Sequence, residues 1–321
     1  MVDNFLNPAS DGSEAIRQLF VAFLWAAAIV LLVVAGLVLY ASRRYRALPR
    51  RASPRRASPE ATDEPPQIHT NKRLEIGILS VTTLVMGGFF YFAIQTMTSV
   101  QAAPAEGQEP DLVITGHQWW WEAYYPASGA VAANEIHIPS GQKLLVRLES
   151  ADVIHDWWVP RLGRKMDAIP GQGNLVWMEA REPGTYLGAC SEFCGAQHAW
   201  MRIQVIAHSP ADFADWEQAQ LQTPAAPTDA LVRRGEALFT QKTCANCHTV
   251  AGTEAQANVG PNLTHVASRE TLLTGILENT PNNLARWLKN PQAIKPGAHM
   301  PDFLLTPDEI NALVAYLQSL K

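Results

Sequence analysis

Cys190-Ser-Glu-Phe-Cys194-Gly-Ala-Gln-His198-Ala-Trp-Met201 is a stretch that places two thiols, an imidazole and a thioether within one short segment. Thiolate, imidazole and thioether are the donors that copper selects, and a methionine is commonly its weak axial ligand. A zinc site would have little use for Met201, and a disulfide between the two cysteines would explain neither His198 nor Met201. These residues therefore favour copper, with zinc and a disulfide as the open alternatives.

The segments around this loop have the composition of β-strands. They are rich in Val, Ile, Trp and Tyr, are punctuated by Gly and Pro, and cover residues 111–125, 135–141, 143–150, 174–188 and 201–208. In the last segment, apolar residues alternate with polar ones from Met201 to Val205, as in a half-buried strand. The pattern predicts a β-sandwich or small barrel over residues 108–208.

A second motif, Cys244-Ala-Asn-Cys247-His248, is a c-type haem attachment sequence. Its two thiols form thioethers with the haem vinyl groups, and the adjoining imidazole binds the iron. A zinc knuckle or a thioredoxin-like pair is the alternative, but zinc would need a second cysteine pair beside this one. Cytochromes c of high potential use a methionine as the other axial ligand, which makes Met300 the candidate and its neighbour His299 the alternative.

The chain that carries this haem motif has a helical texture. Residues 209–228 are expected to be a linker, with a helical-looking stretch (DFADWEQAQLQ) followed by TPAAPT. An all-α domain is expected over residues 229–321, with helical segments at 270–279, 282–291 and 306–321. Thr306 is a candidate N-cap, because Glu309 follows it three residues later.

The first hundred residues contain two long apolar runs, at about 19–40 and 76–97, each long enough to cross a bilayer as a helix. A cleaved signal peptide and a buried core helix are the alternatives, but the residues before the first run are acidic and the run exceeds a usual signal. The intervening loop, 41–75, holds nine basic residues against three acidic ones between Arg43 and Arg73. That excess marks the cytoplasmic side, so both chain ends are expected to face outward.

The net charge of −5 then places a clearly acidic balance on the outward side. An acidic exterior excludes a basic, nucleic-acid-binding surface there.

Several of these segments resemble cytochrome c oxidase subunit II with a fused cytochrome c domain, of the caa3 type. The copper loop, VIHDWWVP (153–160), GHQWWWEA (116–123) and RLEIGIL (73–79) are similar to segments of that family. GPNL (260–263) and KPGAHMPDF (295–303) look like the haem loops of class I cytochromes c. The resemblance covers nearly the entire chain and implies a transmembrane helix hairpin over 1–100, a cupredoxin-like β domain and a class I cytochrome c domain.

The resemblance also implies roles for individual residues. A dinuclear copper centre (CuA) would be bound by His155, Cys190, the backbone carbonyl of Glu192, Cys194, His198 and Met201. The Glu192 side chain would help to hold a magnesium or manganese ion shared with subunit I. Trp119 would accept incoming electrons, and Glu75 would lie at the inner mouth of a proton path. A covalent haem c would be bound by Cys244, Cys247, His248 and Met300.

Two departures affect the aromatic segment. Trp120 stands where a tyrosine is more usual, and Asp156-Trp157 replaces the common Ser-Phe after the first histidine. An aromatic run on a strand is also more often core than electron path, so packing is the alternative role for these tryptophans.

The expected function is an electron relay in a bacterial inner membrane, with the copper and haem domains on the outer side. The expected partners are oxidase subunits I and III, a cytochrome c or a bc1-type complex as donor, and the lipid bilayer, but no nucleic acid. Dioxygen chemistry is assigned to subunit I, so no catalytic residue is expected on this chain. The alternatives are a membrane-anchored copper-delivery module and a protein like nitrous oxide reductase. A quinol oxidase subunit is disfavoured, because the copper ligands are present.

Overall fold

The computed structural model describes residues 4–46, 70–101 and 104–321. The chain forms two compact units, one made of residues 15–99 and the other of residues 1–14 and 100–321. Each unit is described by itself.

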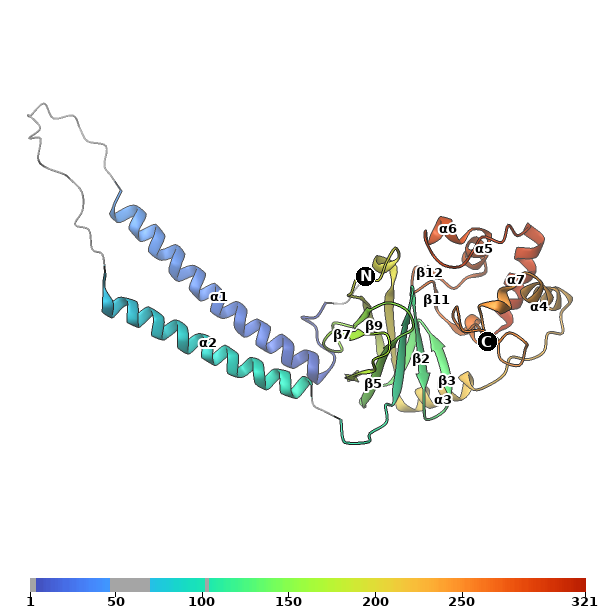
Figure 1. Ribbon diagram of the computed structural model, residues 1–321, viewed down its shortest axis with the longest axis horizontal. Coiled ribbons are helices and arrows are strands. Elements are labelled where there is room, and N and C mark those ends of the chain that lie inside the picture. Colours follow the sequence, from blue (N-terminus) through green and yellow to red (C-terminus); the bar gives the residue numbers. More distant parts are fainter. Residues whose placement is uncertain (1–3, 47–69, 102–103) are drawn as a thin grey trace, which may run out of the picture. The chain divides into compact units, whose positions relative to one another are not determined.

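Two long helices dominate the first unit (Figure 1), α1 (Asp11–Arg44) and α2 (Lys72–Val100). Both are long and apolar enough to cross a membrane, and Phe23 and Phe89 meet edge to face at 5.9 Å. Each helix extends beyond its expected apolar run. In α1, acidic residues occupy the first turn and basic residues the last, where both favour the helix dipole. The predicted basic loop is described only at its ends, because residues 47–69 lie outside the described ranges.

The β domain consists of two five-stranded sheets. The first has the order β3-β2-β1-β5-β8, with bounds Ala130–Ala133, Trp120–Tyr125, Leu112–His117, Lys143–Ser150 and Asn174–Glu179. The second has the order β4-β10-β9-β6-β7, with bounds Glu135–Pro139, Arg202–His208, Gly184–Cys190, His155–Trp158 and Met166–Ala168. Neighbouring strands are antiparallel except β1 with β5 and β10 with β4, which are parallel. The predicted cupredoxin-like β-sandwich is confirmed.

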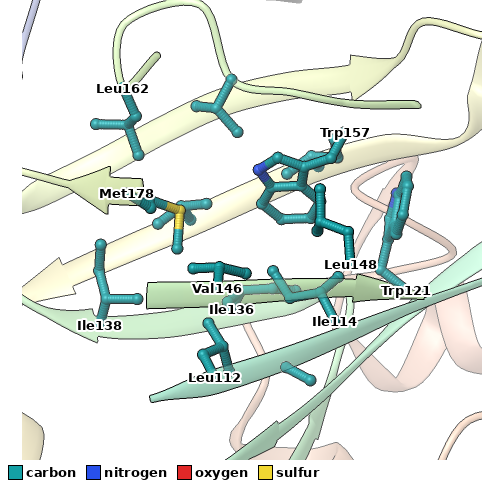
Figure 2. Packing of buried hydrophobic residues seen from close by; sticks show 14 of the residues in the cluster. Leu112, Ile114, Trp121, Ile136, Ile138, Val146, Leu148, Trp157, Leu162 and Met178 are labelled. Atoms are coloured by element: carbon teal, nitrogen blue, oxygen red, sulfur yellow. The ribbon is translucent and has the colours of Figure 1, made fainter. Parts of the chain in front are cut away.

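The core of this domain lies between the two sheets (Figure 2). Alternate residues of β1 point inward, so Leu112 and Ile114 are completely buried, and Trp121 meets Trp157 edge to face at 5.2 Å. Each fully buried aliphatic side chain contributes about 1.5–3 kcal/mol relative to its exposed state. In β6 and β9, Trp157 pairs with Cys190, so His155 and Cys190 lie near one end of the same sheet.

Helix α3 (Pro210–Gln220) occupies the first half of the expected linker. Ser209 caps its first turn by accepting a hydrogen bond from the Asp212 N–H. Trp216 stacks on His137 at 4.2 Å and meets Tyr125 at 5.2 Å. This part of residues 209–228 therefore packs on the β domain.

The C-terminal domain, called the haem domain below after its predicted haem motif, consists mainly of helices. These are α4 (Ala230–Gln241), α5 (Pro281–Lys289), α6 (Pro291–Ile294) and α7 (Pro307–Ser319), with short 3-10 turns η2 (Cys244–Asn246) and η3 (Val266–Ser268). Thr306 and Glu309 form the predicted capping box of α7. Helices α4 and α7 pack closely at Gly235, where a Cβ atom would lie 2.0 Å from the Ala312 carbonyl oxygen.

The helix expected over residues 270–279 is wrong. This segment forms a small hairpin of β11 (Thr271–Leu272) and β12 (Leu277–Glu278). The connection contains Leu273, Thr274 and Gly275, whose φ angles of 58°, 63° and 80° cannot continue a right-handed helix. Asn279 then fixes the returning strand by donating hydrogen bonds to the carbonyls of Val266 and Arg269.

Candidate metal and haem sites

The predicted copper donors converge at one end of the β-sandwich. His155 begins β6, Cys190 ends β9, and their donor atoms lie with that of Cys194 within 4.8 Å of one another. The Cys194 sulfur lies 3.7 Å from the Cys190 sulfur, 3.7 Å from His198 Nδ1 and 3.8 Å from Met201 Sδ. The Glu192 carbonyl completes the group, 3.3 Å from the Cys190 sulfur.

Backbone hydrogen bonds hold the loop that carries these donors. The Cys190 N–H donates to the Met201 carbonyl at 2.9 Å, and the Ser191 N–H donates to the Asp156 carbonyl at 3.1 Å. Between them the loop makes a short 3-10 turn, η1 (His198–Trp200). The two ends of the loop are thereby tied together, and one end is tied to the strand that carries His155.

His155 is oriented by a neighbouring carboxylate. Its ring is fully buried, and Nε2 lies 2.8 Å from Asp152 Oδ1. Nδ1, also buried, has no hydrogen-bond partner among the described residues. A buried imidazole nitrogen without a partner, beside two thiols, fits a metal ligand whose other ring nitrogen is fixed by a carboxylate.

The two thiols differ in acidity. Their mutual hydrogen bond lowers the pKa of Cys190 to about 3. The same hydrogen bond, together with burial, raises the pKa of Cys194. Without metal the pair is therefore one thiolate and one thiol, so binding through both sulfurs must release a proton.

Trp119 lies against the copper loop. Its side chain is 7% exposed, and the indole N–H donates to the Cys194 carbonyl at 3.0 Å. The Gln118 amide donates to the same carbonyl at 2.8 Å. On its other side, the Trp119 ring lies 5.0 Å from the ring of His299 in the haem domain. This tryptophan thus touches both halves of the candidate site.

The predicted haem-binding residues surround one cavity. Cys244 opens the turn η2, and the N–H groups of Cys247 and His248 both donate to its carbonyl at 3.1 Å. The side chains of Cys244, Cys247, His248 and Met300 line the cavity, and Trp119 and Trp120 line it as well. Two thiols, an imidazole and a thioether around an apolar cavity fit a covalently attached haem.

The proximal imidazole has a defined tautomer. His248 Nδ1 lies 2.8 Å from the Pro261 carbonyl, which can only accept, so Nδ1 carries the proton and Nε2 is left to bind iron. Gly260 lies against this ring, where a Cβ atom would be only 2.6 Å from His248 Cε1. Burial lowers the pKa of His248, which keeps the imidazole neutral and able to act as a ligand.

Known proteins match the chain along most of its length. A cytochrome c oxidase subunit 2 of Alkalihalophilus pseudofirmus is 36% identical over 267 residues, covering 80% of this chain and 76% of that protein. The chain belongs to the cytochrome c oxidase subunit II family. The Bacillus subtilis cytochrome c oxidase subunit 2 is 32% identical over 275 residues, covering 80% of this chain and 77% of its own length.

The β domain and the helical domain also match families separately. The periplasmic domain of cytochrome c oxidase subunit II matches residues 130–208, and cytochrome c matches residues 232–321. The periplasmic domain of subunit II of Bradyrhizobium japonicum, a solved structure, is 34% identical, covers 35% of this chain and 95% of that one, and has a TM-score of 0.33.

Membership of the subunit II family gives the chain its general role. It is a membrane-anchored subunit of an oxidoreductase, the haem-copper cytochrome c oxidase. The family implies copper in the β domain and haem in the helical domain. The donor sets described above fit both groups.

Two acidic residues expected to act in this subunit lie at exposed positions. The Glu192 side chain is exposed on the copper loop, while its carbonyl faces the cluster. Glu75 lies in the first turn of α2, where Oε1 accepts a hydrogen bond from the Asn71 N–H at 3.0 Å. Glu75 therefore has a local role as a helix cap in addition to its expected place in a proton path.

Sequence reasoning missed three residues of the subunit II site. Asp152 orients His155, Glu135 binds the haem domain through Thr271, and Lys295 contacts Trp119. Asp152 had a usable signal, since a carboxylate three residues before a ligand histidine is a common orienting partner. Glu135 and Lys295 had none, because their partners are more than a hundred residues away in the chain.

Proposed function

We propose that this chain is the electron-accepting subunit of its oxidase. Its haem c domain receives electrons from a cytochrome c or a bc1-type complex and passes them to the dinuclear copper centre. They then reach haem in subunit I, where dioxygen is reduced to water and protons are translocated. The observation that carries this proposal is Trp119, which lines the haem cavity and donates to the carbonyl of Cys194.

The haem domain is arranged to hold its cofactor rigidly. Cys244 and Cys247, which line the cavity, would attach the haem covalently, and His248 would bind its iron through Nε2. Met300 is the proposed second ligand, because the neighbouring His299 packs against Trp119. Gln292 supports this loop by donating to the carbonyls of Ala298 and Met300. When bound, the haem and the copper pair each carry one electron at a time.

The copper site is proposed to use all six predicted donors, from His155, Cys190, Glu192, Cys194, His198 and Met201. The two sulfurs, 3.7 Å apart, would both bind the copper and supply it with thiolate donors. The buried setting excludes water from the thiolates, and Asp152 keeps the imidazole of His155 in place. A site that is already assembled needs little rearrangement when its charge changes.

The burial of Trp119 supports a particular route for the electron. At 7% exposed, and with Trp120 also 7% exposed, this aromatic pair offers little surface to a separate donor protein. The chain's own haem domain faces these residues through the shared cavity. An external donor is therefore proposed to dock on the haem domain.

The topology proposal rests on the segment before α1. The Ala9 N–H donates to the Arg161 carbonyl at 2.8 Å, and the Arg181 N–H donates to the Ala9 carbonyl at 2.9 Å. Residues before the first span therefore lie on the same side as the copper domain. With the basic loop on the cytoplasmic side, both domains lie outside the bacterial inner membrane.

The remaining assignments concern the other subunits. Subunits I and III are the proposed partners within the membrane. The exposed Glu192 carboxylate is proposed to share a magnesium or manganese ion with subunit I, a contact that its exposure allows. Glu75, at the basic end of α2, is proposed to begin a proton path.

Paired cysteine substitutions in the purified oxidase test the function. Cys190→Ser with Cys194→Ser should abolish the copper EPR signal and leave the c-type haem absorbance. Cys244→Ala with Cys247→Ala should do the reverse, so each pair serves as the control for the other. Both variants should lose oxidation of reduced cytochrome c. Wild-type turnover in either double variant would contradict the proposed relay.

A further inference from the structure

Lys295 is a buried cation at the contact between the haem and copper domains. It follows α6 directly and is 6% exposed. Its Nζ donates a hydrogen bond to the backbone carbonyl of Trp119 at 2.9 Å. The same side chain lines the haem cavity. Lys295 of the haem domain thus binds the backbone of Trp119, and the Trp119 side chain contacts the copper loop of the β domain.

Burying an ammonium group is costly unless it is well paired, so a buried lysine at this place calls for a function. Burial lowers the pKa of Lys295 to about 8, and the electrostatic effect of the nearby Cys194 opposes that shift. Lys295 therefore remains largely protonated near neutral pH. The electrostatic interaction between Lys295 and Cys194 is mutual and, because buried charges are weakly screened, the ammonium group also acts on the copper loop.

Trp119 is held by three contacts that come from different elements. The copper loop binds its indole through the Cys194 carbonyl at 3.0 Å. The ring of His299, next to the proposed haem ligand Met300, lies 5.0 Å away. Lys295 fixes the backbone on which this side chain is mounted. Removing Lys295 would leave the indole attached to the copper loop and beside His299, but would release the Trp119 backbone from the haem domain.

We propose that Lys295 is a positioning residue for electron transfer from the haem domain to the copper pair, and that its positive charge raises the reduction potential of that pair. This inference rests on the proposed function. In the step concerned, one electron leaves the ferrous haem and reduces the oxidised copper pair. No covalent bond forms or breaks, and Lys295 neither gains nor loses its proton.

The test uses the purified full oxidase carrying Lys295→Met, which keeps an unbranched apolar stem but removes the charge and the N–H donors. A photoactivated reductant injects one electron into the haem, and absorbance then follows its arrival at copper. Redox titration gives the potentials of both centres. Lys289→Met is the matched control, because it removes an exposed lysine of the same domain.

We expect Lys295→Met to slow the haem-to-copper step by about tenfold, since small displacements of a positioned group are costly. The copper potential should also fall, whereas Lys289→Met should change neither quantity. A purely structural role would lower the melting temperature without moving the potential. A wild-type rate and potential in Lys295→Met would overturn this inference while the proposed function stands.

Two further outcomes are informative. If Lys295→Met fails to retain both centres, Lys295→Gln decides, because its amide is one bond too short to reach the Trp119 carbonyl. The inference then expects slower transfer and a lower copper potential in Lys295→Gln, and wild-type values would overturn it. If the unmodified oxidase passes no electron from haem to copper, the proposed function fails and this inference falls with it.

Discussion

The carboxylate of Glu135 accepts hydrogen bonds from both the backbone N–H and the hydroxyl of Thr271, each at 2.7 Å. Glu135 lies on β4 of the copper domain and is 2% exposed, whereas Thr271 begins the hairpin of the haem domain. The Glu270 N–H adds a third hydrogen bond at 3.1 Å. A single buried carboxylate therefore collects three donors from the neighbouring domain.

Replacing this carboxylate should loosen the contact between the domains. In Glu135→Gln one carboxylate oxygen is replaced by an amide NH2 group, which cannot accept hydrogen bonds from Glu270 and Thr271. The negative charge is also lost, and a hydrogen bond to a charged group contributes about 1.5–3 kcal/mol. We expect both cofactors to be retained and hydrogen exchange at the amides of Glu270 and Thr271 to become faster. Glu149→Gln, in an exposed ion pair with Arg147, is the control. Unchanged protection of these two amides would contradict the anchoring role.

Trp119→Phe should separate electron transfer from copper binding. Phenylalanine keeps an aromatic ring but cannot donate to the Cys194 carbonyl. We expect an unchanged copper EPR spectrum and haem-to-copper transfer slower by about tenfold or more, because the aromatic bridge is displaced. Trp177→Phe, a partly exposed position on β8, is the comparison. Equal rates in the two variants would remove Trp119 from the route.

Gly260→Ala should disturb the iron ligand without preventing haem attachment. The new methyl group would lie 2.6 Å from His248 Cε1, so the imidazole must move and its hydrogen bond to the Pro261 carbonyl must weaken. Overpacking of this kind costs about 1–3 kcal/mol. Haem should remain bound through both thioethers but show a partly high-spin absorption spectrum. Gly163→Ala is the control, since its methyl group would meet no atom within 4 Å. A wild-type spectrum in Gly260→Ala would argue against the described ring position.

His137 should make the β domain sensitive to acid. Burial, together with the charges of His208 and Arg269, lowers its pKa to about 3. Because the unfolded chain takes up a proton near pH 6.5 and the folded one does not, stability is full above pH 6.5 and falls as the pH drops towards 3. Between pH 7 and pH 5 this single group should cost on the order of 2 kcal/mol.

The effect is measured as a difference between variants. His137→Phe keeps an aromatic ring beside Trp216 but has no proton to gain. The fall in melting temperature between pH 7 and pH 5 should be smaller in His137→Phe than in the wild type. Other titrating groups contribute equally to both proteins, so their effect on the melting temperature cancels in the comparison. Asp156 is one such group, because burial and the neighbouring Asp167 raise its pKa to about 7. Parallel melting curves for the two proteins would exclude His137 as the source.

The copper and haem motifs could be predicted because their donors lie close together in the chain. Five of the six proposed copper donors fall within residues 190–201, and the haem motif within 244–248. Their spacing indicates copper and haem binding even when the fold is not known. His155 required the family resemblance, because a single histidine on a strand has no pattern of its own. The strands of the β domain were visible from their alternation and turn residues.

The contacts between domains could not be predicted in this way. Thr271 belongs to an apolar stretch that was expected to be helical, and it forms a strand in which two of its groups bind Glu135. Leu273 and Thr274 adopt left-handed conformations, which leucine and threonine do not favour, so the sequence gives no sign of them. The contact of Lys295 with Trp119 is seen only in the folded structure, because the two residues are far apart in the chain. Such pairs depend on tertiary packing rather than on neighbours in sequence.

The close contact at Gly235 has a consequence for the order in which the protein is made. The residue that leaves no room there, Ala312, lies in α7, and the haem cysteines come between the two helices in the chain. Cys244 and Cys247 therefore emerge from the ribosome before the partner that completes their shelter exists. Until α7 has been made, these two thiols lie on an incomplete core, so the packed enclosure of the candidate haem site can form only after α7.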